Sequence, residues 1–138
     1  MIAREFVTAG HAVFTVANPT GQHFTYRVTT SDDPSRPAWF VGVLTGPSNE
    51  TDYSYHGLFD PATGAVRTTA KSKVSADALS AKVLRWALDV VYGRRSLPAG
   101  YAIEHSGSCG RCGRTLTEPE SLESGIGPTC RQRMDVAA

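Results

Sequence analysis

The chain has three cysteines, Cys109, Cys112 and Cys130, and all lie near its C-terminus at a spacing typical of metal ligands. Cys109 and Cys112 are separated by two residues, one of them glycine, so both thiolates can bind one side of a tetrahedral ion. Cys130 and the nearby His105 can bind the other side. The pattern predicts one Zn²⁺ held by these four residues. A filled tetrahedral shell predicts a structural rather than a catalytic ion.

The fourth ligand has alternatives to His105, namely Glu104, Glu118, Glu120 or a water molecule. A redox role for the CxxC pair is disfavoured, because no βαβ pattern typical of thioredoxin precedes it. A nucleobase deaminase would need an H-x-E motif followed by P-C-x-x-C, whereas here Glu104 precedes the histidine. The ion is therefore predicted to hold the segment together.

The residues around the cysteines predict a small treble-clef-like arrangement. Glycines in the CxxC turn allow the backbone to curl, so that its amides can point at the sulfurs. Residues 119–124 can form a short helix that ends at Gly125. Cys130 is expected at the start of a last helix over residues 129–135, where the helix dipole and free amides favour a thiolate.

This part of the chain resembles uncharacterised proteins of actinobacteria and their phages that share a C-terminal zinc-binding domain of unknown function. The motifs that carry the resemblance are His105-x-x-x-Cys109-Gly-Arg-Cys112-Gly-Arg, Leu116-Thr-x-Pro-Glu-Ser121 and Gly125-Ile-Gly-Pro-x-Cys130. Upstream, the resembling stretches are Ala12-Val-Phe-Thr-Val, Phe24-Thr-Tyr-Arg-Val and Phe40-Val-x-Val-Leu-Thr-Gly-Pro. The resemblance implies ligand roles for the matched His105, Cys109, Cys112 and Cys130, and a phage origin. It implies no activity.

The residues before the cysteines predict an antiparallel sheet. Alternating or continuous apolar patterns predict strands at residues 11–17, 23–29, 38–44, 53–59 and 65–69. Short turns rich in Pro and Gly join them, so the strands are expected to form a meander. In the fourth strand, Tyr53, Tyr55 and Phe59 are expected on one face.

One helix is predicted to cover this sheet. Ser75 is a suitable N-cap and Asp77 would lie in the first turn. The helix is expected to end near Tyr92, before Gly93. Its apolar stripe consists of Leu79, Val83, Trp86, Ala87 and Val90. The predicted fold class is α+β, with a sheet-and-helix domain at residues 1–98 and a zinc-binding segment at residues 99–138.

Charge is distributed unevenly along a chain whose net charge is only +1. Residues 67–95 hold seven cations against two acids, a local excess of five that could attract a polyanion. The predicted function is a non-enzymatic, zinc-stabilised binding module with a nucleic-acid backbone as partner. The predicted contact residues are Arg67, Lys71, Lys73, Arg94, Arg95, Arg111, Arg114, Arg131 and Arg133.

Two other classes of function stay open. The near-neutral charge and the acidic first 66 residues favour a small phage-type protein that binds and inhibits or redirects a host protein. An enzyme would need His11, His23 and His56 to meet on one sheet face, and the chain has no phosphate-binding glycine loop, G-x-S-x-G or HExxH motif. The polar loop at residues 48–52 could hold a ligand, although its composition favours a plain surface turn.

The N-terminus and the cysteine count predict the compartment. Residues 1–6 lack the apolar region of a signal peptide, and no apolar run is long enough to cross a bilayer. An odd number of cysteines fits metal binding better than disulfides. We therefore expect a cytoplasmic protein without membrane contact, in the bacterial host cytoplasm if it is phage-encoded.

Overall fold

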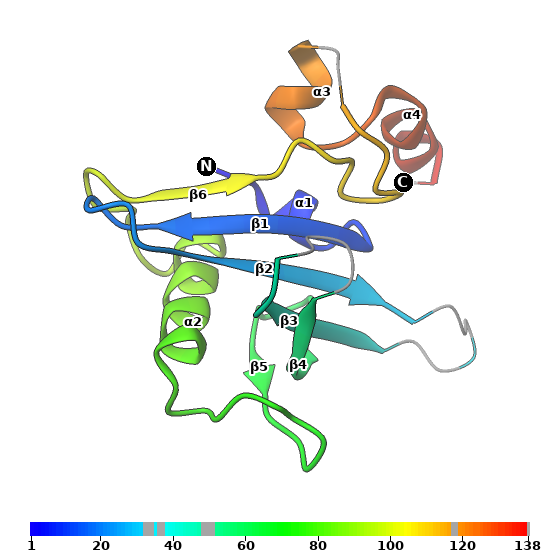
Figure 1. The fold of residues 1–138 in the computed structure, drawn as a ribbon. Coiled ribbons are helices and arrows are strands. Elements are labelled where there is room, and N and C mark those ends of the chain that lie inside the picture. Colours follow the sequence, from blue (N-terminus) through cyan, green and yellow to red (C-terminus); the bar gives the residue numbers. More distant parts are fainter. Residues whose placement is uncertain (32–34, 36–37, 48–51, 117–118, 138) are drawn as a thin grey trace.

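The computed structural model describes residues 1–31, 35, 38–47, 52–116 and 119–137. Its centre is a curved antiparallel sheet in the order β5-β4-β3-β2-β1-β6 (Figure 1). The strands are β1 (His11–Ala17), β2 (His23–Thr30), β3 (Trp39–Leu44), β4 (Tyr53–Phe59), β5 (Val66–Arg67) and β6 (Ala102–His105). The first five form the predicted meander, so the α+β fold class is confirmed.

The sixth strand was not predicted. β6 pairs antiparallel with β1, with Phe14 opposite His105 and Ala17 opposite Ala102. Ile103 at its centre is fully buried, and this single core residue gives β6 no periodic pattern that a sequence could reveal. β6 belongs to the segment predicted to begin at residue 99, so the sheet runs directly into the cysteine-bearing part of the chain. The boundary at residues 98 and 99 stays a prediction.

Four helices complete the described fold: α1 (Arg4–Val7), α2 (Leu79–Val91), α3 (Pro119–Ser124) and α4 (Pro128–Ala137). α2 covers one face of the sheet, while α3 and α4 lie beyond β6 with the cysteine-bearing turn (Figure 1). Side chains of α2 and of the sheet share one core that includes Phe14, Tyr26 and Leu88. The Tyr26 hydroxyl donates a hydrogen bond of 2.7 Å to the Ser80 carbonyl, which ties β2 to the first turn of α2.

The rotation of α2 differs from the prediction. The residues that it buries are Ala81, Leu84, Ala87, Leu88 and Val90. In contrast, Leu79 is 67% exposed, and Val83 and Trp86 are only half-buried. Apolar residues occupy more than half of the circumference of α2, so two overlapping stripes exist and the sequence does not decide which one faces the sheet. Leu79, Val83 and Trp86 of the predicted stripe line a pocket, described below.

The predicted N-cap is also wrong. α2 begins at Leu79 after Ala78, and no side chain caps it. Ser75 instead closes a turn ahead of the helix, where its hydroxyl oxygen accepts a hydrogen bond of 3.2 Å from the Asp77 amide. Such a local hydrogen bond stabilises a turn as readily as a helix start.

A register shift in β4 changes which side chains share a face. Gly42 of β3 lies opposite Tyr55, while the adjacent Val41 lies opposite Gly57, so His56 is the extra residue. Extra residues of this kind bend a strand and invert its later alternation. Phe59 consequently lies in the core, apart from Tyr55, which packs on the other face against Phe40 with ring centroids 6.2 Å apart. The prediction that Phe59 shares a face with the two tyrosines is wrong.

Candidate metal centre

The three cysteines converge on one point. Their sulfur atoms all lie within 4.8 Å of one another. Cys109 and Cys112 belong to a tight turn that a β-bridge between Ser108 and Thr115 closes, and the Cys109 amide donates to the Arg114 carbonyl at 2.8 Å. Cys130 lies in the first turns of α4. The pairing of a CxxC turn with a cysteine near a helix start is therefore as predicted.

Backbone contacts fix Cys130 beside the turn. The Gly110 amide donates to the Gly125 carbonyl at 2.7 Å, which joins the turn to the segment between α3 and α4. The Gly127 amide donates to the Cys109 sulfur at 3.3 Å. A side chain at Gly127 would lie in ordinary contact with that sulfur, whereas at Gly125, with φ +75°, a side chain would be strained. The Gly125-Ile-Gly-Pro run thus brings the last helix to the CxxC turn.

The thiols have strongly different proton affinities. Burial raises the pKa of Cys109, but hydrogen bonds from the backbone amides of Gly127, Cys112 and Arg111 together lower it to about 7. Burial raises the pKa of Cys130 to about 11, and its cysteine neighbours add to this increase. The cluster therefore ionises fully only when a cation balances its charge.

The sulfur positions fit such a cation. Four ligands in a tetrahedron around Zn²⁺, with Zn–S of about 2.3 Å, would place the sulfurs about 3.8 Å apart. The observed spacing, within 4.8 Å, needs only a small contraction. Cys109 and Cys130 are buried and Cys112 is exposed. The three residues can thus supply three ligands of a metal ion.

His105 lies outside this group. Among the described residues, the group of possible ligands consists of the three cysteines. The Nδ1 atom of His105 accepts a hydrogen bond of 3.0 Å from the Gly107 amide, and its Nε2 atom contacts the Leu122 carbonyl. The ring also packs on Phe6, with ring centroids 5.6 Å apart. His105 lies at the end of β6, and this position sets the direction of its side chain. Its contact with the Leu122 carbonyl joins α3 to the sheet.

The alternative ligands Glu104 and Glu120 do not belong to the group formed by the three cysteines either. Glu104 is exposed and forms an ion pair of 3.1 Å with the N-terminal amine of Met1. Glu120 is exposed and is not a member of the group, and Glu118 lies outside the described residues. The chain therefore supplies an incomplete ligand set in its described part.

An N-terminal residue that sequence reasoning missed supports the cysteine-bearing turn. Phe6 in α1 is 1% exposed. A Cβ atom placed on either Gly110 or Gly125 would lie 2.6 Å from Cδ2 of its ring, so both glycines are needed for the close contact. A helix of four residues has no detectable periodicity, and the only signal was an aromatic residue near the N-terminus.

The histidines predicted as an alternative site do not meet. His11 and His23 lie at opposite ends of the β1–β2 hairpin, opposite Thr29 and Ala17 respectively. His56 lies in β4, with two strands between it and β1, and is fully buried. The polar loop at residues 48–52 lies outside the described residues, apart from Asp52.

The predicted basic contact residues are partly engaged elsewhere. Arg94 and Arg95 both pair with Asp89, at 2.9 and 3.8 Å. Arg131 pairs with Glu5, and the Arg111 guanidinium donates to the Cys130 carbonyl at 3.3 Å. Among the predicted contact residues, those that are exposed and have no such contact with the described residues are Arg67, Lys71, Lys73, Arg114 and Arg133. The positive footprint is therefore smaller than the sequence suggests.

Comparison with known proteins identifies one family match. The model of DUF6011, a family of unknown function, matches residues 102–135. This range contains β6, α3, the three cysteines and most of α4. The match agrees with the predicted resemblance to an uncharacterised family. No curated protein and no solved structure matches the chain.

Proposed function

We propose that the chain is a non-enzymatic binding module whose C-terminal segment is stabilised by one structural Zn²⁺ bound to Cys109, Cys112 and Cys130. The observation that carries this proposal is the convergence of three sulfurs, two of them buried, from two separate elements. Thiolates favour zinc over the hard cations Mg²⁺ and Ca²⁺. Among the described residues between Cys109 and Cys130, the buried apolar side chains are Leu116 and Ile126, and the ion would add to this small core.

The proposed role is structural for an electrostatic reason. Three thiolates more than neutralise a divalent ion, and a centre with net negative charge does little to acidify a water molecule. His105 is held by Gly107 and Leu122, so we infer that the fourth ligand is water, a group from outside the chain, or Glu118, which lies outside the described residues. The separation of His11, His23 and His56 gives no support to an enzyme.

Metal analysis and hydrogen exchange on the purified protein test this proposal. We expect one zinc per chain by native mass spectrometry. Removal of the ion by a chelator should abolish amide protection at Cys109 and Gly110 while the amides of β1 to β3 stay protected, because most residues of the shared core belong to the sheet, α1 and α2. A metal-free protein with protected amides in the cysteine-bearing turn would contradict the proposal.

The proposed partner is a nucleic-acid backbone. Support comes from Arg67 on the edge strand β5 and from Lys71 and Lys73 in the loop after it, which are exposed. Salt-dependent binding of a fluorescent duplex is the measurement. Three phosphate contacts would give a slope of about −3 in a plot of log affinity against log salt concentration.

A matched pair of variants sharpens the nucleic-acid experiment. Arg67→Glu should weaken binding, whereas Arg94→Glu should change it less, because Arg94 already pairs with Asp89. A flat salt response would discard the nucleic-acid partner. A stoichiometric protein that is retained from a bacterial lysate after nuclease treatment would instead support the alternative of a host protein.

A further inference from the structure

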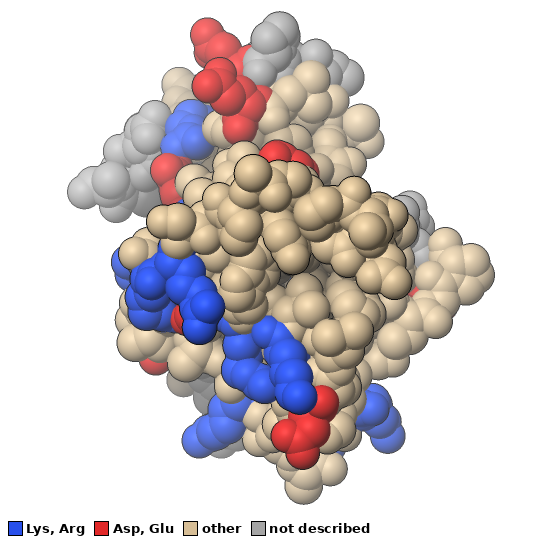
Figure 2. All heavy atoms as spheres, turned by 90° about the vertical axis from the view of Figure 1, so that its left-hand side faces the viewer, with Lys and Arg blue, Asp and Glu red and all other residues tan. Residues whose placement is uncertain are grey.

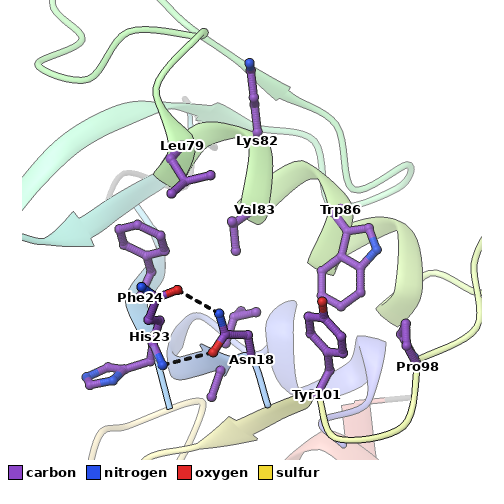
Figure 3. Close-up of a pocket in the computed structure, with 12 residues that line it drawn as sticks. Asn18, His23, Phe24, Leu79, Lys82, Val83, Trp86, Pro98 and Tyr101 are labelled. Carbon is purple, nitrogen blue, oxygen red and sulfur yellow. Dashed lines mark hydrogen bonds between the residues drawn. The ribbon is translucent and has the colours of Figure 1, made fainter. Parts of the chain in front are cut away.

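A pocket of about 600 Å³ lies between α2, the turn that joins β1 to β2, and the turn before β6 (Figure 3). This volume is within the range typical of sites for small molecules. The lining residues are Val16, Ala17, Asn18, Gln22, His23, Phe24, Leu79, Lys82, Val83, Trp86, Pro98 and Tyr101. The pocket lies away from the cysteine cluster and involves none of its residues.

Aromatic rings stand on two sides of this pocket. Phe24 lies on one side, and Trp86 and Tyr101 lie on the other (Figure 3). The centroids of the Trp86 and Tyr101 rings are 5.3 Å apart. Val83 lies between the two sides, and Leu79 at the mouth is 67% exposed. Rings placed in this way favour a flat, apolar guest, which can contact a ring on each side.

The polar groups at the base of the pocket already have partners. The Asn18 side-chain amide donates to the Gln22 side-chain oxygen at 3.0 Å, and the Gln22 backbone amide donates to the Asn18 side-chain oxygen at 3.0 Å. These hydrogen bonds close the turn between β1 and β2. A guest therefore gains little from them, and its main contacts would be apolar.

The described residues that line the pocket include a positively charged side chain and no negatively charged one. None of the twelve described lining residues carries a carboxylate, whereas Lys82 carries a full positive charge. Lys82 is exposed, and its ammonium group points away from the cavity in Figure 3, on a flexible side chain that can turn back to the mouth. Figure 2 shows uncharged residues around a hollow on this face of the molecule, with Lys and Arg side chains and a few Asp or Glu side chains beside it.

We propose that this pocket binds a small molecule with a flat apolar or aromatic body and a single negatively charged group. Phe24, Trp86 and Tyr101 would contact the body, and Lys82 would pair with the anionic group. This inference goes beyond the proposed function and does not depend on the metal.

Two fluorescent probes test the proposal separately for the apolar and the charged part. Anilinonaphthalene sulfonate is aromatic and carries one negative charge, and N-phenylnaphthylamine has the same body without the charge. Both should bind saturably with one site per chain, and amide chemical shifts of Val83 and Tyr101 should change. Lys82→Glu should weaken the sulfonate about fivefold, the upper range for a surface ion pair, and leave the neutral probe within about twofold.

The control for charge is Arg85→Glu on the same helix. Arg85 is exposed and does not line the pocket, so neither probe should lose affinity. Leu79→Ser should weaken both probes without lowering the melting temperature, because Leu79 is exposed.

Three outcomes would overturn the proposal. The first is no saturable binding of either probe, and the second is an equal loss of sulfonate affinity in the Lys82 and Arg85 variants. The third is shift changes outside the pocket, which would indicate adventitious binding only. Binding of the neutral probe without the sulfonate would overturn the anionic part and point to an apolar side chain of a protein partner.

Discussion

The ring of Phe6 occupies the space in which a side chain at Gly125 would have to lie. A Cβ atom at Gly125 would be 2.6 Å from Cδ2 of Phe6, and Gly125 also has a φ of +75°. The residues are far apart in the sequence, and their contact joins the N-terminal helix α1 to the turn between α3 and α4. Phe6 is thus one of the side chains through which the cysteine-bearing part of the chain packs on the sheet domain.

Gly125→Ala should therefore destabilise the protein by about 2–4 kcal/mol. About 1–2 kcal/mol comes from the left-handed backbone, and the rest from overpacking against Phe6, which is too buried to move. The free energy of unfolding in urea, measured with zinc present, gives this value. Gly107→Ala is the matched control: Gly107 has a φ of +88°, but a Cβ atom there meets nothing within 4 Å. An equal loss in both variants would contradict the Phe6 contact.

Features of the metal centre that depend on residues close together in the sequence could be predicted. Features that depend on contacts between distant segments could not. The spacing of Cys109 and Cys112 and the glycines around them are adjacent in the sequence, so the cysteine cluster could be predicted. The contact of Phe6 with the cysteine-bearing turn could not be predicted, because it depends on packing between segments more than a hundred residues apart. The orientation of His105 could not be predicted either, since it follows from the pairing of β6 with β1.

Metal stoichiometry in variants should separate His105 from the cysteines. His105→Ala should keep one metal ion per chain, because both ring nitrogens are engaged with Gly107 and Leu122 rather than directed at the sulfurs. Cys130→Ser should lose the ion or bind it at least about tenfold more weakly. Cobalt substitution followed by absorption spectroscopy measures both. A changed cobalt spectrum and weaker binding in His105→Ala would show that the histidine is a ligand after all.

The hydroxyl of Tyr26 should contribute measurably to the packing of α2. It donates to the Ser80 carbonyl at 2.7 Å, and burial raises its pKa above the usual range. Tyr26→Phe should lower the free energy of unfolding by about 1 kcal/mol, the typical value of such a hydrogen bond. Tyr101→Phe serves as the control, since Tyr101 is 38% exposed and its hydroxyl forms no hydrogen bond with the described residues. Equal stability of Tyr26→Phe and wild type would contradict a role for the bond.

The sheet shows where period-two patterns stop being informative. Alternation in β1 and β2 predicted that these segments are strands, and Phe14, Tyr26 and Val28 lie in the core. In β4 the extra residue His56 inverts the alternation, and the adjacent Gly57 is the one signal of this shift, because glycine inside a strand pattern often marks a bulge. For α2, the apolar residues were identified, but the rotation depends on the curvature of the sheet that it covers. A sequence pattern predicts whether a segment forms a strand or a helix, whereas tertiary contacts determine which face of that element is buried.

His56 should make stability depend on pH. Its side chain is fully buried, and neither ring nitrogen has a hydrogen-bond partner among the described residues. Burial lowers the pKa of His56 below 6.5, an interaction with the backbone of His56 itself opposes this in part, and the Arg85 guanidinium lowers the pKa further. Above pH 6.5 the imidazole is neutral in both the folded and the unfolded chain, so it adds no pH dependence. As the pH falls below 6.5, the unfolded chain binds a proton that the folded chain resists, and stability decreases by up to about 1.4 kcal/mol per pH unit.

His56→Leu should remove this part of the pH dependence. Urea unfolding at pH 7 and pH 5 measures the difference, and wild type should lose more stability than the variant over this interval, by up to about 2 kcal/mol. At pH 7 the variant should be at least as stable as wild type, because leucine buries no unpaired polar atom. The exposed His23 provides the control, and His23→Gln should keep the wild-type pH profile. The same loss of stability in His56→Leu as in wild type would show that other groups cause the acid sensitivity.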